Sequence, residues 1–151
     1  METLYAYLAG AIDIDGRIFI SRARDYRRGD RQITYYSAVI NLSDSDPVLP
    51  DLLQATFPAS RLQYEAKNRS HRKWHMWEAV GQKAQEPLIR LLPHLRIKQR
   101  QAELALSLIN LMQSDKAGSV RPLSEEQEQA RRLLYDQVTS LNASRPQRTY
   151  R

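Results

Sequence analysis

The sequence contains no cysteine and no long uninterrupted apolar run. The absence of cysteine excludes disulfides and thiolate metal sites, and it is consistent with a reducing compartment. We expect no transmembrane helix and, because a helical pattern begins almost at Met1, no signal peptide or amphipathic leader. The histidines, His71, His75 and His94, lack metal-ligand spacing and are given no catalytic role. We therefore expect a soluble intracellular protein, in the cytoplasm of a bacterium or phage host, or in a chloroplast or mitochondrion if it is encoded there.

Positive charge is in excess, because 23 Lys and Arg stand against 17 Asp and Glu and give a formal net charge of +6. Eleven of the 23 basic residues lie in the segments 17–31 and 61–73. This bias favours nucleic acid over a membrane as partner, since no basic helix carries a continuous apolar face. The length of 151 residues suits one core. We expect a single domain over 1–142 and a basic C-terminal tail over 143–151.

Hydrophobic periodicity predicts that helices alternate with pairs of strands. Apolar residues from Leu4 to Ile12 recur at helical spacing, which predicts a helix over 3–14 that ends near Gly16. Segments rich in β-forming residues predict two hairpins, one from 17–24 and 32–43 and one from 61–67 and 73–80. The other predicted elements are helices near 47–57, over 85–95 with an interruption near Pro93, over 95–113, and from a capping box at Ser124 and Gln127 to about Leu141.

The stretch YLAGAIDIDG, residues 7–16, places Asp13 and Asp15 at the C-terminal end of an apolar helix. Exposed carbonyl groups concentrate negative potential there, so two carboxylates are destabilising unless a cation lies nearby. A divalent cation such as Mg²⁺, which binds carboxylate and carbonyl oxygens, would remove the conflict. The structural alternative is a helix whose small residues around Gly10 allow close packing, followed by an Asp-Gly turn.

The segment LAGAIDIDG, residues 8–16, resembles the LAGLIDADG motif of homing endonucleases and differs from it at Ala11 and Ile14. The predicted αββαββα order resembles the core of that family. The segments LRIKQRQAELAL (95–106) and LNASRPQRTYR (141–151) resemble the basic segment and the tail of its homodimeric members. The resemblance implies an α+β fold of αββαββα order, with a saddle-shaped antiparallel DNA-binding sheet and additional C-terminal helices.

The resemblance also implies an activity, namely divalent-metal-dependent cleavage of both strands of a long pseudo-palindromic DNA target by an enzyme encoded in an intron or other mobile element. Asp15 and the carbonyl of Ile14 are the implied metal ligands, and Asp13 is implied to be structural. Because the chain has one motif, the active site requires a homodimer that shares two or more Mg²⁺ ions, for which Mn²⁺ or Ca²⁺ can substitute in binding. Double-stranded DNA is the implied partner, with no membrane and no small-molecule substrate. The implied dimer interface consists of Leu8, Ala9, Gly10 and Ile12.

Two further residues have implied catalytic roles, each with a structural alternative. Lys98 matches the family's active-site lysine, which positions water or stabilises transition-state charge, but a solvated lysine at a helix start is the alternative. Asp44 falls near a position that holds metal-bound water in the family, and a turn-capping aspartate is its alternative. For the whole chain, the rival of the enzyme is a non-cleaving relative such as an intron RNA maturase or a regulator. The presence of Asp15 and Lys98 favours the enzyme.

Alternation along the strands divides their residues between a helix-covered face and an opposite face. We expect the covered face to hold Ala38, Ile40, Leu42, Leu62, Tyr64 and Trp74. The resemblance places the other face in the DNA major groove, where a mixture of polar side chains suits readout of base edges. The predicted DNA contacts are Tyr35, Ser37, Asn41, Arg61, Gln63, Glu65, Lys67, Lys73, His75 and Trp77, with Phe19, Ser21, Arg22 and Arg24 from a first strand whose register stays open, and Arg145 and Arg148 from the tail.

Overall fold

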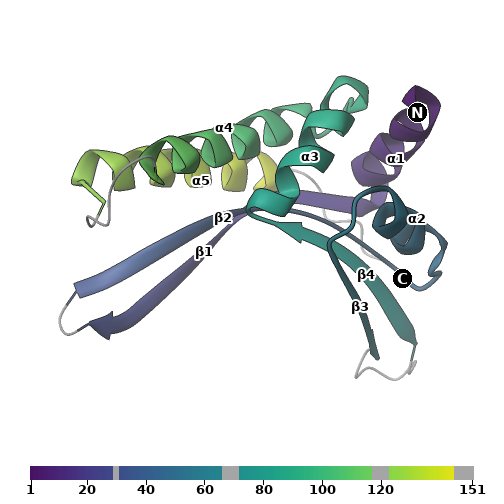
Figure 1. Ribbon diagram of the computed structural model, residues 1–151, viewed down its shortest axis with the longest axis horizontal. Coiled ribbons are helices and arrows are strands. Elements are labelled where there is room, and N and C mark those ends of the chain that lie inside the picture. Colours follow the sequence, from purple (N-terminus) through teal and green to yellow (C-terminus); the bar gives the residue numbers. More distant parts are fainter. Residues whose placement is uncertain (29–30, 66–71, 117–122, 145–151) are drawn as a thin grey trace.

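The computed structural model describes residues 1–28, 31–65, 72–116 and 123–144, and Figure 1 shows their arrangement. The elements in chain order are α1 (Glu2–Asp15), β1 (Gly16–Arg28), β2 (Arg31–Asp44), α2 (Val48–Thr56), β3 (Ser60–Glu65), β4 (Lys73–Val80), α3 (Gln82–Leu91), η1 (Leu92–His94), α4 (Gln99–Lys116) and α5 (Glu125–Ala143). This α+β order confirms the predicted fold class. Within the described ranges, no helix is long and apolar enough to cross a membrane.

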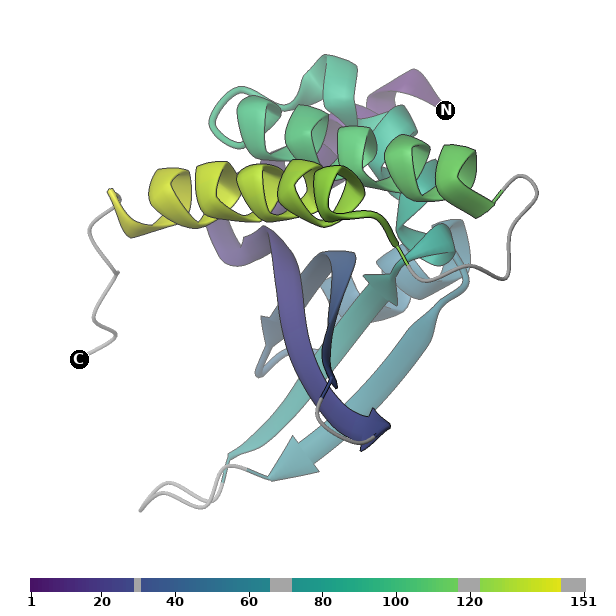
Figure 2. The same ribbon diagram turned by 90° about the vertical axis from the view of Figure 1, so that its left-hand side faces the viewer.

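The four strands form one antiparallel sheet in the order β1-β2-β4-β3. The β1/β2 hairpin and the β3/β4 hairpin diverge from the centre of the sheet as the two arms of an arch (Figures 1 and 2). The helices lie on the outer side of this arch, which we call the convex face, and the open inner side is the concave face. The centre of the arch is held by pairing of β2 with β4, in which Leu42 lies opposite Trp77.

The hydrophobic core lies between the convex face and the helices. Strands β1 and β2 contribute alternate residues, and the predicted covered positions Ala38, Ile40 and Leu42 are indeed fully buried. The other core residues come mainly from α1, α3 and α4, whose contributions include Leu8, Ala9, Ile12, Leu88, Leu91, Ala105 and Leu108. The core therefore packs α1 directly against the convex face of the sheet.

The junction of α1 and β1 contains no loop. Gly16 has φ −87° and ψ 176°, which is extended backbone, so the helix passes directly into the strand and the expected Asp-Gly turn is absent. A Cβ atom at Gly16 would lie 2.7 Å from Ile12 Cδ1 and 2.9 Å from the Asn41 carbonyl oxygen. Glycine is required at this position because the helix and β2 approach it too closely for any side chain.

The helix predicted over 95–113 begins later than expected, at Gln99. Pro93 lies in the 3₁₀ turn η1, and the backbone leaves helical geometry at Leu95, which is extended with φ −68° and ψ 137°. By contrast, the capping box before α5 is confirmed. Gln127 N–H donates to Ser124 Oγ at 3.2 Å, and Ser124 N–H donates to Gln127 Oε1 at 2.8 Å. Local chemistry thus predicts the start of α5, whereas the start of α4 depends on Asp13, which is distant in the sequence.

Candidate catalytic centre and nucleic-acid interface

The C-terminal end of α1 and the segment before α4 are joined by reciprocal capping. The Asp13 carboxylate accepts backbone N–H groups of three successive residues: Arg96 at 2.7 Å on Oδ2, and Ile97 at 3.1 Å and Lys98 at 2.9 Å on Oδ1. In return, the Lys98 ammonium donates to the carbonyl oxygens of Ile12 at 2.8 Å and Asp13 at 2.6 Å. Both Asp13 and Lys98 are buried.

This arrangement shows how the chain tolerates a carboxylate at the negative end of a helix. The Lys98 ammonium lies against the carbonyl groups in the last turn of α1, where a cation is favoured. The Asp13 carboxylate accepts the backbone N–H groups that precede α4, as an N-terminal capping side chain does. The alternative of a solvated lysine is wrong, because the side chain of Lys98 is buried and hydrogen-bonded. The implied structural role of Asp13 agrees with these contacts, while catalysis by Lys98 stays a prediction.

Replacement of Lys98 by Met, which keeps the aliphatic stem and removes the ammonium, should lower the free energy of unfolding by about 3 kcal/mol. The reason is that two buried carbonyl groups lose a charged donor. Arg100→Met is the matched control, since Arg100 is exposed and forms a surface ion pair with Glu103 at 3.2 Å, for which less than about 1 kcal/mol is expected. Denaturant unfolding of both variants tests the difference, and equal stabilities would refute the capping role of Lys98.

Asp15 and Ile14 lie at the exposed tip of α1, where the helix meets β1. A carboxylate next to main-chain carbonyl groups is the donor set that Mg²⁺ prefers, so these residues fit the implied ion chemically. Among the described residues there is no group of three or more His, Cys, Asp or Glu side chains that could hold a metal ion.

Asp44, at the end of β2, has the contacts of a turn-capping residue. Its Oδ1 accepts the backbone N–H of Asp46 at 3.1 Å and lies 3.5 Å from Ser45 Oγ. Asp46 in turn accepts the N–H of Val48 at 2.9 Å and caps the start of α2. The capping alternative is thus realised, and a role of Asp44 in holding metal-bound water stays a prediction.

The register of β1 is now defined. Phe19 lies opposite Val39, Ser21 opposite Ser37, and Ala23 opposite Tyr35, so these side chains share the concave face. Nearer the centre of the arch, the Arg17 guanidinium lies 4.8 Å above the ring of Phe19. Phe19, Ser21, Tyr35 and Ser37 are therefore available to a ligand in the arch. Asn41 shares this face, and its amide donates to Glu78 Oε2 at 3.0 Å.

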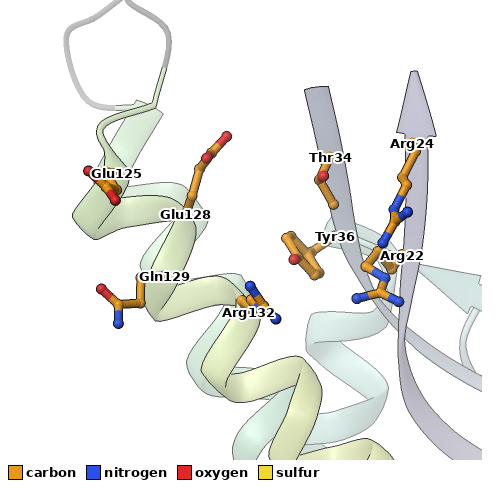
Figure 3. Close-up of a pocket in the computed structure, with 8 residues that line it drawn as sticks. All are labelled: Arg22, Arg24, Thr34, Tyr36, Glu125, Glu128, Gln129 and Arg132. Carbon is orange, nitrogen blue, oxygen red and sulfur yellow. The ribbon is translucent and has the colours of Figure 1, made fainter. Parts of the chain in front are cut away.

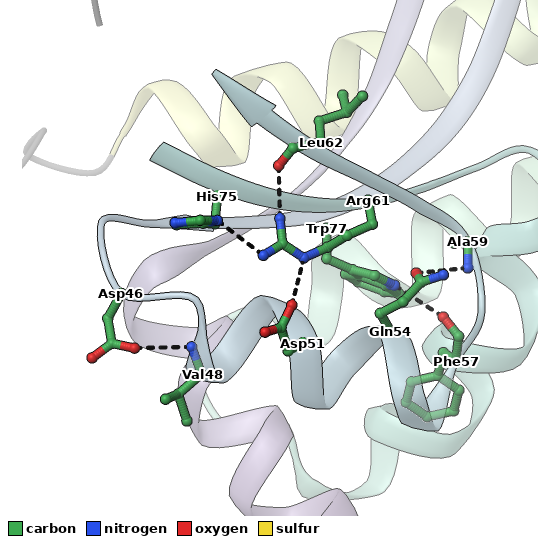
Figure 4. Close-up of polar contacts among 10 residues, drawn as sticks. All are labelled: Asp46, Val48, Asp51, Gln54, Phe57, Ala59, Arg61, Leu62, His75 and Trp77. Atoms are coloured by element: carbon green, nitrogen blue, oxygen red, sulfur yellow. Dashed lines mark hydrogen bonds and ion pairs between the residues drawn. The ribbon is translucent and has the colours of Figure 1, made fainter. Parts of the chain in front are cut away.

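The predicted faces of β3 and β4 are wrong. Trp77 is fully buried on the convex face, and its indole N–H donates to the Phe57 carbonyl at 2.9 Å (Figure 4). Arg61, opposite Trp77, bonds Asp51 of α2 at 2.9 Å and His75 Nδ1 at 3.0 Å. The predicted DNA contacts that instead lie on the convex face are Arg61, Gln63, Glu65, Lys73, His75 and Trp77. The residues predicted on the covered face that instead lie on the concave face are Leu62, Tyr64 and Trp74.

Arg22 and Arg24 also lie on the convex face, so the register that the sequence left open puts these two predicted DNA contacts on the side away from Ser21. Their partners across the hairpin are Tyr36 and Thr34. Together with side chains of α5 that include Glu128 and Arg132, they line a pocket of about 510 Å³ (Figure 3). The Arg22 guanidinium lies 4.6 Å above the ring of Tyr135, which fixes it against α5. The predicted contacts Lys67, Arg145 and Arg148 lie outside the described residues.

The predicted dimer interface is also corrected in part. Leu8, Ala9 and Ile12 have no exposed surface, because they pack into the core of their own chain. The opposite side of α1 presents Ala6, Tyr7, Gly10 and Ile14, and Tyr7 and Ile14 are 58% and 53% exposed. A Cβ atom at Gly10 would meet nothing within 4 Å. We call these four residues the α1 stripe.

Comparison with known proteins gives a consistent structural result. No protein-family model and no curated protein matches the sequence. Among solved structures, the homing endonuclease I-CvuI in complex with its target in the presence of Ca has a TM-score of 0.72 and 21% identity, over 99% of this chain and 87% of that chain. The group I intron-encoded homing endonuclease I-CeuI with DNA gives a TM-score of 0.67 and 14% identity over 91% and 67%. The archaeal intron-encoded homing endonuclease I-Vdi141I with DNA has a TM-score of 0.64 and 11% identity, over 99% of this chain and 88% of that chain.

These similarities extend over nearly the whole chain, and they place α1, the arch of strands and the outer helices in one known arrangement. The fold of this protein is that of the LAGLIDADG homing endonucleases. The resemblance drawn from residues 8–16 is thereby confirmed at the level of the fold.

Proposed function

We propose that this protein is a homing endonuclease that cleaves double-stranded DNA at a specific, long, pseudo-palindromic site and is encoded in an intron or other mobile element. The observation that carries the proposal is the position of Asp15. It is an exposed carboxylate at the tip of α1, and the next residue begins the strand that lines the concave face. Metal-binding chemistry and a surface for DNA thus meet at one point of the chain.

Asp15 and the Ile14 carbonyl would hold Mg²⁺. When bound, a pair of such ions activates water and stabilises the leaving oxygen in phosphodiester hydrolysis. The chain's own contribution is to fix the backbone of α1, since Asp13 and Lys98 tie its last turn to the segment before α4. The use of a divalent ion is supported by the crystal structures of I-CvuI with DNA, one in the presence of 2 mM Ca and one in the presence of 2 mM Mg, in which the DNA is not cleaved.

A homodimer would supply the second Asp15. The α1 stripe offers a surface of small residues next to Gly10, flanked by Tyr7 and Ile14, that is suited to close approach of another helix. A second argument comes from longer proteins: the chain aligns over 97% of its own length with only 45% of I-SmaMI, a LAGLIDADG homing endonuclease bound to cleaved DNA. The remainder of such a chain has room for a second unit of this size.

Gly10→Leu should abolish the dimer while leaving the chain folded. The side chain has space within the protomer, because a Cβ at this position meets nothing within 4 Å. Replacement of a helical glycine should also stabilise α1 by up to about 1 kcal/mol. Leucine would block the approach of a second α1, however, and sedimentation velocity should show a monomer that no longer cleaves DNA.

The matched control is Asn110→Leu, which adds a leucine at an exposed position of α4 and should leave the assembly unchanged. A Gly10→Leu variant that still sediments as a dimer would place the interface elsewhere. A parent protein that cleaves specific DNA as a monomer would refute the dimer itself.

The test of the proposed function is cleavage of a randomised duplex DNA library in Mg²⁺, followed by sequencing of the cut ends. The proposal expects one recurrent, approximately two-fold symmetric site. Specific duplex binding without cleavage, or specific binding of RNA instead, would favour the non-cleaving maturase or regulator. The exposed Asp15 supports the enzyme, since a pure binding protein gains nothing from a carboxylate that repels phosphate.

A further inference from the structure

The concave side of the β3/β4 arm is apolar. Leu62 and Tyr64 are 47% and 44% exposed, and their partners in β4 are Met76 and Trp74, which are partly exposed. These four residues, which we call the apolar patch, contain no charged group. The next concave residue along β4 is Glu78, and its carboxylate accepts the Asn41 amide at 3.0 Å.

The other arm presents different chemistry on the same face. There the concave side chains include Ser21, Tyr35 and Ser37, whose hydroxyl groups can both donate and accept hydrogen bonds. The concave surface of the sheet thus carries these hydroxyl groups beside Phe19 and Ala23 on β1/β2, and the apolar patch on β3/β4. Arg61, Glu65 and Lys73 of this arm lie on the convex side, where Arg61 is held by Asp51 of α2.

We infer that the apolar patch recognises thymine, through the 5-methyl groups that duplex DNA exposes in its major groove. This inference rests on the proposed function. The occupant is argued from continuity, because β3 and β4 belong to the same sheet as β1 and β2 and form the other arm of the arch (Figure 1). The thymine methyl is the apolar group that standard base edges present in the major groove. Guanine is typically read by Arg or Lys, and the Arg61 guanidinium in β3 is directed to Asp51 of α2 instead.

The experiment begins with selection of bound duplexes from a randomised library by full-length Asp15→Asn protein, which is expected to bind without cutting. Each half of the selected site should contain thymines at a fixed position. Deoxyuridine is then placed at each of these thymines, which removes only the methyl group. The dissociation constant should rise about fourfold for each methyl that contacts the patch. A duplex with 5-methylcytosine at these positions should bind more tightly than the same duplex with cytosine.

Neighbouring residues of β3 provide a matched pair of variants. Leu62→Ser removes apolar surface from the patch, and Gln63→Ser changes an exposed residue on the other side of the same strand. The Leu62 variant should bind thymine and deoxyuridine duplexes with similar affinity, while the Gln63 variant should keep the parental difference. Leu62→Ser should fold, because almost half of the side chain is already exposed.

The possible failures are distinguishable. Selection of no duplex at all would overturn both the proposed function and this inference. Selection of a specific site whose affinity does not depend on any thymine methyl would overturn the inference alone. A change in sedimentation caused by Leu62→Ser, without a change in discrimination, would show that a second copy of the chain covers the patch and would also overturn it.

Discussion

Asp15→Asn should reduce the rate of DNA cleavage by at least about 1000-fold, the effect expected when a bound divalent ion that contributes several kcal/mol to transition-state stabilisation is lost. The variant keeps the size of the side chain and its ability to form hydrogen bonds, but loses the negative charge that would hold the metal. Folding should be unaffected or slightly improved, since a negative group leaves the negative end of α1. Affinity for duplex DNA should persist.

Cleavage of a selected target in Mg²⁺ and binding of the same duplex without cleavage measure the two effects separately. Asp136→Asn is the control, because Asp136 is an exposed carboxylate on α5 whose ion pair with Arg132 is long at 3.9 Å. It should cut at the parental rate. If Asp15→Asn also cut at near the parental rate, the assignment of the metal ligand would be wrong. Loss of DNA binding together with cleavage would indicate a role in the interface instead.

Asp13→Ala should have the largest effect on stability, lowering the free energy of unfolding by about 3–5 kcal/mol, as expected for removal of one partner from a buried charged network. Three backbone N–H groups between Arg96 and Lys98 lose their acceptor. For a chain of this length, the midpoint of thermal unfolding should fall by roughly 10 °C.

A second cap in the same chain gives the matched comparison. Asp46 accepts one backbone N–H, that of Val48 at 2.9 Å, and is exposed. Asp46→Ala should therefore cost about 1 kcal/mol, the usual value for an exposed helix cap. Thermal and denaturant unfolding of the two variants measure the loss of stability at each position, and the two losses can be compared directly. Similar losses at both positions would mean that the junction of α1 and α4 contributes little to stability.

Elements whose signals are local could be predicted from the sequence. The helix over 3–14, both hairpins and the capping box at Ser124 follow from periodicity and capping chemistry, and all are present in the structure. The start of α4 could not be predicted in this way. It depends on Asp13, a residue more than 80 positions away, whose carboxylate satisfies the N–H groups before the helix.

The faces of β3 and β4 could not be assigned from alternation alone, because alternation separates two sets of residues without saying which set is covered. Trp74 and Trp77 necessarily lie on opposite faces, and either could have been the core residue. Pairing of Leu42 with Trp77 decides the question, and that register is a property of the assembled sheet. Of the α1 stripe, Gly10 was predicted, but Ala6, Tyr7 and Ile14 were not, because the most apolar side of the helix is used by the chain's own core and a less apolar side is left exposed.

Because no loop separates α1 from β1 at Gly16, a change in the orientation of α1 also changes the direction of β1. Strand β1 has 13 residues, from Gly16 to Arg28, and at about 3.3 Å per residue it extends roughly 40 Å from the tip of α1. A rotation of α1 by about 5° would therefore move the far end of the strand by about 3.5 Å, which is close to one base-pair step along DNA. In the proposed dimer, the number of base pairs between the two halves of the target is thus set by the angle at which the two α1 helices cross, and mutations in residues that touch no base could change it.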